Sequence, residues 1–380
     1  MPHPETATAP DGTTTCARIH LDNLAHNVDV LRRRAGSVEL MAVVKANAYG
    51  HGADIVTRAL EEAGVTFLAV AYLPEAIKLR EAGIRGRILV FAPPLPDTHA
   101  LYTTYDLEAV VDGERAVDAL RPASRPLPVH IKVDTGMRRY GIRPADAPDF
   151  VTMVGRSPHL DLAGLWTHFA DAENPDSPVT RAQLTEFRGL MRDLSPLPCP
   201  VHASNSGTIY TCPDTLDPAL VTWARVGGSL FGLLDLPAAR AELKHVMEVR
   251  SPVRTVRAVR AGERVSYGGI WSAPQDTVTA TIGAGYADGL PRLLSSRGHV
   301  QIGERSYPIV GTVCMDSFLV DLGPDNEHGI EAGQDAILLG ENPSAFDIAT
   351  ACHTISYEVT CRISQRVPRL PYIGSFPQPN

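Results

Sequence analysis

The chain has 380 residues, of which 44% are hydrophobic and 21% charged, and its formal net charge is -8 at pH 7. This composition is typical of a globular protein with a large core, and it excludes a fibrous or wholly disordered chain. The negative charge argues against a nucleic-acid partner or an anionic membrane surface held by general positive charge.

The sequence also predicts the compartment of the protein. No apolar run approaches the roughly 18 residues of a membrane span, and the first residues lack the pattern of a signal peptide. The six cysteines stand apart, with no C-x-x-C pair, so neither a disulfide framework nor a structural metal site is expected. We therefore expect a cytoplasmic protein, without a bound metal, that begins with a disordered tail over residues 1–14.

Between residues 15 and 245, short apolar runs alternate with segments of helical pattern. Nearly continuous apolar runs are typical of parallel strands that are buried on both faces. These runs lie at residues 41–45, 67–71, 88–92, 107–111, 129–133, 162–169, 201–204 and 221–226.

Several of the intervening segments carry helix start and stop signals. We expect one helix capped by Asp22 and ended by Gly36, one over residues 54–63, and one opened by Pro74 and closed by Gly83. Eight strand–helix units predict an α/β fold of the (β/α)8 barrel type, although an open doubly wound sheet also fits the alternation.

Residues 246–380 have a different pattern, with short strand-like runs separated by Gly, Pro and Asp. We expect a mostly antiparallel β-domain here, with which the first few residues after the tail could pair. The expected strands cover residues 246–260, 278–282, 299–302, 309–313, 318–322 and 336–339, and one helix covers 345–353.

Polar and basic residues gather where the predicted barrel strands end, which is where such barrels place their active sites. Lys45 lies in the first apolar run, and its ammonium group is costly to bury. It either snorkels to the strand rim or serves as an amine of lowered pKa that forms a Schiff base. A barrel does not need the convergence of Lys132, His168, His202 and Arg225 for stability, although each histidine alone would be an ordinary core residue.

Nine sequence strings, in this order, resemble those of alanine racemases. They are VKANAYGHG at 44–52, KVDTGM-x-R at 132–139, THFA at 167–170, NS at 205–206, R-x-G at 225–227, SYG at 266–268, GYADG at 285–289, VCMD at 313–316 and YEV-x-C-x-IS-x-RVPR at 357–369. The resemblance covers essentially the whole chain, from about residue 16 to 370. It implies a (β/α)8 barrel with a C-terminal β-domain, the cofactor pyridoxal 5'-phosphate (PLP), a small amino-acid substrate and a homodimer with shared active sites.

The resemblance also implies roles for residues around the cofactor. Lys45 matches the lysine that holds PLP covalently. Arg225 matches an arginine that donates to the pyridine nitrogen without protonating it. His202 matches a residue that orients this arginine, and His168 matches a residue that stacks near the ring. The residues that match the phosphate-binding groups are Tyr49, Ser206, Gly227, Gly228 and Tyr357. Without the resemblance, the two glycines would predict only a tight turn.

Further matches concern the substrate. Racemisation needs one proton-transferring group on each face of the α-carbon, and the resemblance assigns Lys45 and the partner subunit's Tyr267 to these roles. Without it, Tyr267 would be taken for a buried strand aromatic. Arg139 and the backbone amide of Met315 match groups that hold the substrate carboxylate. Lys132 matches a lysine that some relatives carry as a carbamate, which pairs with that arginine. Tyr286 and Asp316 match residues that line the entrance.

The predicted function is PLP-dependent racemisation of a small amino acid, foremost L-alanine to D-alanine for peptidoglycan precursors. Alternatives are a racemase of serine or of a broader range, a barrel-type PLP decarboxylase, and a non-catalytic PLP-binding protein. Arg225 and Tyr267 argue against the decarboxylase, and the residues after 246 argue against the non-catalytic protein. Some positions depart from the usual family pattern and put strict alanine preference in question: Arg138, Glu173, Gly228, Phe231 and Thr312.

Overall fold

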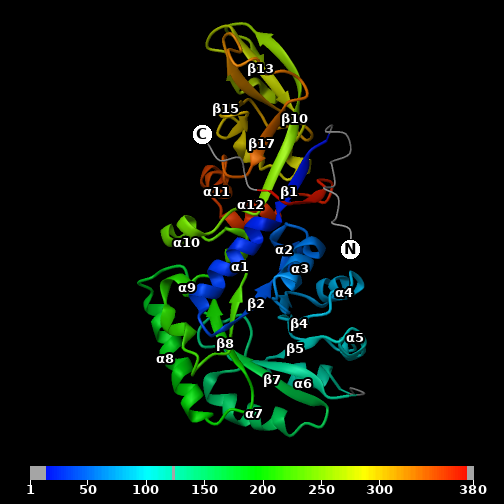
Figure 1. Cartoon of the computed structure of the whole chain (residues 1–380), viewed down its shortest axis with the longest axis vertical. Helices are drawn as coiled ribbons and strands as arrows, with labels where there is room; N and C mark the ends of the chain where they lie inside the picture. The colour runs from blue at the N-terminus through cyan, green and yellow to red at the C-terminus, as the bar shows by residue number, and fades with distance from the viewer. Residues whose placement is uncertain (1–13, 122–124, 375–380) are drawn as a thin grey trace.

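The computed structural model describes residues 14–121 and 125–374. The chain forms two lobes, a barrel below and a β-domain above in the view of Figure 1. The tail expected over residues 1–14 lies outside the described residues, apart from Thr14. The predicted combination of an α/β barrel with a mostly antiparallel β-domain is confirmed.

The lower lobe is a closed barrel of parallel strands. Its first strand pairs with its last, with Glu39 opposite Trp223 and Ala42 opposite Val226. This closure shows that the alternative of an open doubly wound sheet is wrong. The strands are β2 Glu39–Val43, β3 Phe67–Val70, β4 Arg87–Val90, β5 Glu108–Val111, β6 Leu127–Lys132, β7 Leu160–Trp166, β8 Val201–Asn205 and β9 Trp223–Val226.

Helices follow the barrel strands and pack their apolar faces on the outside of the sheet. The right-handed helices of this lobe are α1 Leu21–Ala35, α3 Ala53–Glu62, α4 Leu73–Glu81, α5 His99–Thr104, α6 Glu114–Ala119, α7 Ala147–Gly155, α8 Pro178–Asp193, α9 Thr208–Thr211 and α10 Pro237–Glu242, with 3-10 turns η2 Pro144–Asp146, η3 Pro213–Leu216 and η4 Gly228–Phe231. Asp22 does not cap α1 as expected, because the cap position is His20; the Asp22 carboxylate instead accepts from the amide of Gly374 at 2.9 Å.

The interior of the barrel is divided between an apolar and a polar part. Large apolar side chains, including Met41, Phe67 and Trp223, pack against one another inside the ring of strands. The remaining interior space holds buried polar side chains such as His130 and His202. Since buried polar groups cost free energy unless they are hydrogen-bonded, this polar part needs internal partners.

The upper lobe is built on the long strand β10, which is visible along its length in Figure 1. The first part of β10 pairs with β17 and the second part with β13, so the sheet folds back on itself. Strand β1 joins this lobe, antiparallel to β10 and parallel to β18. The strands are β1 Cys16–His20, β10 Met247–Val259, β11 Arg264–Val265, β12 Trp271–Ser272, β13 Thr277–Ile282, β14 His299–Ile302, β15 Arg305–Val310, β16 Phe318–Gly323, β17 Asp335–Leu339 and β18 Arg369–Tyr372.

Short helices of the upper lobe complete the junction with the barrel. Ser344 caps α11 through its side chain, which accepts from the amide of Asp347. Helix α12 lies near the mouth of the barrel and brings the ring of Tyr357 to 5.9 Å from that of Tyr49. The remaining elements are α11 Ala345–Cys352, α12 Ser356–Cys361, and the 3-10 turns η5 Tyr267–Gly269, η6 Tyr286–Asp288 and η7 Arg292–Leu294.

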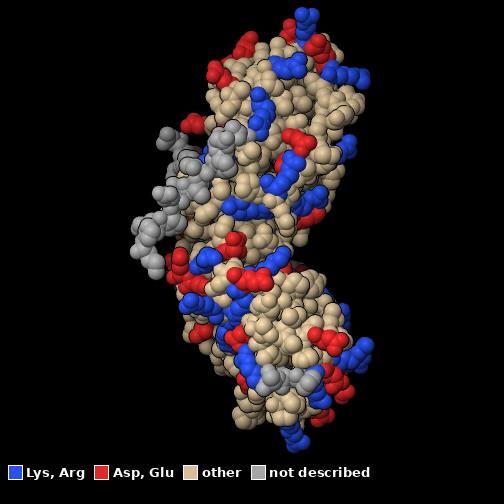
Figure 2. All heavy atoms as spheres, turned by 90° about the vertical axis from the view of Figure 1, so that its right-hand side faces the viewer, with Lys and Arg blue, Asp and Glu red and all other residues tan. Residues whose placement is uncertain are grey.

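The surface gives no sign of a single charged field on the face drawn in Figure 2, where basic and acidic side chains alternate over both lobes. Among the described helices, none is long and apolar enough to cross a membrane. Within residues 14–121 and 125–374, no group of His, Cys, Asp and Glu side chains has an arrangement that could hold a metal ion.

Candidate active site

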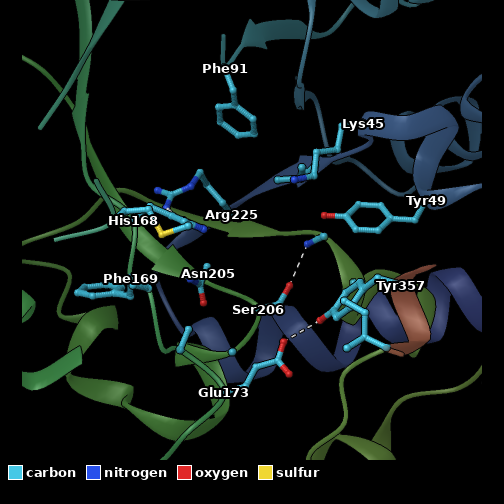
Figure 3. Close-up of a pocket in the computed structure, with 18 of the residues that line it drawn as sticks. Lys45, Tyr49, Phe91, His168, Phe169, Glu173, Asn205, Ser206, Arg225 and Tyr357 are labelled. Atoms are coloured by element: carbon cyan, nitrogen blue, oxygen red, sulfur yellow. Dashed lines mark hydrogen bonds between the residues drawn. The ribbon is translucent and has the colours of Figure 1, made fainter. Parts of the chain in front are cut away.

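A cavity of about 650 Å³ opens at the C-terminal ends of the barrel strands. Figure 3 shows Lys45, Tyr49, Ser206 and Arg225 around this cavity. Strands β2, β7, β8 and β9 and helix α12 all contribute to its wall. The sequence-predicted residues that line it are Lys45, Tyr49, Arg139, His168, Ser206, Arg225, Gly227, Gly228 and Tyr357.

Lys45 does not lie within the strand, as the apolar run suggested, because β2 ends at Val43. The chain then makes a turn of left-handed helix, α2 Lys45–Tyr49, in which residues 46–49 have φ values between 53° and 56°. Non-glycine residues are strained in this conformation, by roughly 1–2 kcal/mol each. The turn therefore needs external support.

Glu75 supplies part of this support from the start of α4. Its carboxylate accepts from the amide of Ala46 at 2.6 Å and from the amides of Ala71 and Tyr72 at 2.9 and 3.0 Å. Asn47 adds a second brace, because its side chain accepts from the amide of Ala53 at 2.8 Å. These contacts fix the backbone directly after Lys45.

The environment of Lys45 favours a neutral amine. Burial lowers the pKa of Lys45 below its ordinary value, and the positive charge of Arg139 lowers it further. A neutral amine is the form that attacks a carbonyl carbon and that accepts a proton. The lysine thus has the chemistry of a Schiff-base residue and of a base.

Opposite Lys45, hydroxyl and amide groups surround a small space beside two glycines. Ser206 Oγ accepts from the amide of Gly227 at 2.9 Å, and the amide of Gly228 has no acceptor in the described part of the chain. A Cβ atom on Gly227 would lie 2.4 Å from the Tyr49 hydroxyl, and one on Gly228 would lie 2.0 Å from a ring carbon of Tyr357. Only glycine fits these positions, so this donor-lined cradle is open to an anion the size of a phosphate.

The hydroxyl of Tyr357 has a partner that the sequence did not lead us to expect. It donates to the Glu173 carboxylate at 2.9 Å, a contact that Figure 3 marks with a dashed line. Burial raises the pKa of Glu173, and the hydroxyl of Tyr357 partly offsets this rise. Since a phenol has one proton to donate, Tyr357 cannot donate to Glu173 and to a phosphate at the same time.

Arg225 is buried below the cavity, and both terminal nitrogens of its guanidinium group donate to acceptors of the protein. Nη1 donates to the carbonyl of His202 at 2.8 Å and faces Nδ1 of that histidine at 3.2 Å. Nη2 donates to the carbonyls of Thr167 and Ala203 and to Nδ1 of His168, at 2.8, 3.0 and 3.0 Å. Within the described residues only the Nε–H group lacks an acceptor, so it is the donor available to a ligand in the cavity.

Lys132 is 2% exposed and lies beside the cavity wall. Its Nζ atom donates to the carbonyl of Val133 at 2.6 Å and lies 4.8 Å from the centre of the Trp166 ring. Burial, followed by the charge of Arg225, lowers the pKa of Lys132 to about 7. Near neutral pH the neutral and the protonated amine are therefore both populated.

The remaining sequence-predicted residues lie on the β-domain and do not line the cavity of their own chain. Tyr267 is 75% exposed, so the interpretation as a buried strand aromatic is wrong. The amide of Tyr286 donates to the carbonyl of Cys314, which brings η6 beside Met315. Tyr267, Tyr286 and Met315 are exposed side chains, and we call them the β-domain patch.

Two further contacts position this patch. The Thr312 hydroxyl donates to the carbonyl of Tyr267 at 2.7 Å, which gives Thr312 a structural role. Asp316 pairs with Arg366 at 2.7 Å. The amide of Met315 has no acceptor in the part of the chain that the structure describes, so it is available to an anion.

Two other family departures have structural explanations. Arg138 has a φ of 57°, a conformation that glycine adopts at less cost, and its amide donates to the Asp134 carboxylate at 3.0 Å. Phe231 is fully buried and stacks on His51 with ring centres 4.2 Å apart. Neither residue lines the cavity.

Sequence reasoning missed several residues around the site. Phe91 and Cys361 line the cavity, and Glu75, His130 and Glu108 act behind its wall. A signal for His130 was present, because it stands two residues before Lys132 and alternation places both side chains on one face of a strand. No comparable pattern in the sequence predicts the contact between Glu75 and the backbone after Lys45.

The fold and the cavity define a barrel enzyme with a buried amine at its mouth. Residues 19–235 match the family model "Alanine racemase, N-terminal domain", and residues 246–371 match "Alanine racemase, C-terminal domain". The curated alanine racemase of Chlorobaculum tepidum is 40% identical over 379 residues, covering 96% of this chain and 97% of that protein.

Solved structures agree with these matches. The alanine racemase of the D-cycloserine producer Streptomyces lavendulae superposes with a TM-score of 0.87 at 37% identity, covering 97% of this chain and 99% of the other. The Bartonella henselae enzyme, described with covalently bound pyridoxal phosphate, superposes with a TM-score of 0.85 at 26% identity, covering 95% and 100%. The chain belongs to the alanine racemase family, which confirms the resemblance and favours a racemase over the decarboxylase and the non-catalytic protein.

Proposed function

We propose that this protein interconverts L- and D-alanine in the cytoplasm, with PLP linked to Lys45, as a homodimer with shared active sites. The observation that carries the proposal is the cavity itself, which joins an amine of lowered pKa, a donor-lined cradle and one free guanidinium N–H. These are the three contacts that the aldehyde, the phosphate and the ring nitrogen of PLP require.

The residues present fit the cofactor. Ser206, Tyr49 and the amide of Gly228 would hold the phosphate, and the amide of Gly227 and the hydroxyl of Tyr357 would join them if they leave Ser206 and Glu173. The Nε–H group of Arg225 would donate to the ring nitrogen, with His168 beside it. PLP, when bound, withdraws electrons from the substrate α-carbon so that its proton can be removed.

Two groups on opposite faces of the α-carbon would then move the proton. We assign Tyr267 Oη of the partner subunit to removal of the proton from the L form and Lys45 Nζ to removal from the D form, with the other group returning a proton each time. Tyr267 is exposed and outside its own cavity, which supports a role in the partner's site. An isologous dimer would complete two equal sites.

The substrate carboxylate would bind between Arg139, which lines the cavity, and the amide of the partner subunit's Met315. Tyr357 stands against Gly228 and limits the room for the substrate side chain, which supports alanine over larger amino acids. Tyr286 and Asp316 would line the entrance from the partner subunit. In this arrangement Lys132, as a carbamate, would supply a negative charge next to Arg139.

The direct test incubates the PLP-loaded protein with single L-amino acids and measures the D-enantiomer by chiral chromatography. We expect D-alanine as the fastest product and D-serine as a slower one. Borohydride reduction followed by peptide mapping should place the pyridoxyl group on Lys45. A label on Lys132, or no D-alanine formation, would contradict the proposal.

A further inference from the structure

A row of hydrogen bonds crosses the barrel interior below Arg225. Nη1 of Arg225 lies 3.2 Å from Nδ1 of His202, and Nε2 of His202 lies 2.9 Å from Nδ1 of His130. Nε2 of His130 lies 2.7 Å from the Glu108 carboxylate. The row thus joins the cavity to the opposite, N-terminal end of the barrel, where Glu108 begins β5.

The two ends of this row determine where its protons lie. A guanidinium group has only donors, so Nδ1 of His202 must accept and its Nε2 must carry the proton. That proton points at Nδ1 of His130, which must therefore accept, so the His130 proton also lies on Nε2. It points at Glu108, and a carboxylate only accepts. The same direction follows from either end.

The charge states agree with this direction. Burial opposes ionisation of Glu108, but hydrogen bonds from His130 and Arg87 outweigh it and hold the pKa of this carboxyl at about 2. Burial lowers the pKa of His130, and it lowers the pKa of His202 well below the ordinary value. Two neutral histidines thus connect an ionised carboxylate to a guanidinium.

The neighbouring strand leaves room for the row. His130 is on β6 and His202 on β8, and β7 lies between them with Gly164 beside the contact. A Cβ atom on Gly164 would lie 2.3 Å from Nδ1 of His130. Any side chain here would displace the atom that accepts from His202, so the contact depends on this glycine.

We propose that Glu108 and His130 are positioning residues of the racemase, which act through His202 to hold Arg225 so that only its Nε–H group faces the cofactor ring. The inference deepens the proposed function and rests on the role of Arg225 toward the ring nitrogen. A misplaced guanidinium leaves the ring nitrogen open to protonation, which makes the ring a stronger electron acceptor and favours transamination over racemisation.

The first test locates the protons by neutron diffraction from deuterium-exchanged crystals of the PLP-loaded protein. We expect deuterium on Nε2 of both His130 and His202 and none on their Nδ1 atoms. Deuterium on Nδ1 of either histidine would overturn the proposal. This result is independent of the proposed function, which fails instead if Lys45 does not take up PLP.

The second test compares two glycine substitutions. Gly164→Ala should lower the ratio of racemisation to transamination about tenfold, as expected when a buried donor loses its acceptor, and should shift the absorbance of bound PLP. Gly155→Ala is the matched control, since a Cβ atom there meets no atom within 4 Å. Equal ratios and spectra for the two variants would contradict a role for the row.

A third comparison separates positioning from mere support of the fold. His130→Asn keeps an oxygen that can accept from His202 but loses the contact with Glu108, so it should lower the ratio only about threefold, whereas His130→Leu removes both contacts and should lower it at least as much as Gly164→Ala. The two variants should have similar melting temperatures. Equal losses of the ratio in both would show that His130 only fills space.

Discussion

The two halves of the proposed active site differ in how far a single chain completes them. In the barrel half, Lys45, Arg225 and the glycine cradle are held by buried hydrogen bonds around one cavity. In the β-domain half, the β-domain patch is exposed, and its Met315 amide has no acceptor among residues 14–121 and 125–374 of its own chain. The comparison teaches that one chain already organises the barrel half, whereas the patch has a function only in the dimer that we propose.

The largest expected effect comes from the barrel half. Lys45→Ala removes both the covalent anchor and one base, so alanine racemisation should fall by about 10⁴-fold or more. The variant should also lose the absorbance of lysine-bound PLP. Chiral product analysis and absorbance spectra measure the two losses, and retention of either signal would place the anchor elsewhere.

The β-domain half should respond differently. Tyr267→Phe should reduce racemisation about 10²- to 10⁴-fold, the usual contribution of a general acid or base, while PLP remains bound. The reason is that the proposed cofactor contacts, including Tyr357 on α12, all surround the cavity and do not involve Tyr267. Loss of PLP together with activity would show that the two halves are not separable in this way.

The sequence predicted the elements and site residues that depend on a local pattern of neighbouring residues. The barrel strands, the helix over 345–352 and the lysine motif were all visible, because apolar runs and helix signals are local. The left-handed turn after Lys45 was not, since its support comes from Glu75, far along the chain. The row through His130 and Glu108 was missed for the same reason: it depends on which strands lie side by side.

A moderate effect should distinguish the cradle from the rest of the barrel half. Gly228→Ala forces the ring of Tyr357 to move, because the new Cβ atom would lie 2.0 Å from it. Overpacking of this kind costs about 1–3 kcal/mol, so PLP affinity should fall about tenfold. Equilibrium binding of PLP measures the change, and Gly155→Ala serves as control. Unchanged affinity would mean that the cradle is not the phosphate site.

The smallest effect concerns Lys132. Its pKa of about 7 implies that the neutral amine fraction rises as pH rises through 7, and only the neutral amine adds CO2 and releases a proton. At fixed dissolved ¹³CO2, a carbamate carbon signal should grow between pH 6 and pH 8 and be absent in Lys132→Met. A signal that stays constant with pH, or that survives in the variant, would contradict the assignment.

The central claim is that each site joins Lys45 of one subunit to Tyr267 of the other, and a mixed dimer tests it most directly. Combining Lys45→Ala subunits with Tyr267→Phe subunits places both defects in one site and leaves the other site intact. Two individually inactive proteins should then regain roughly half of wild-type activity per mixed dimer. No recovery, despite demonstrated subunit exchange, would mean that Tyr267 serves its own chain's site or is not the second base.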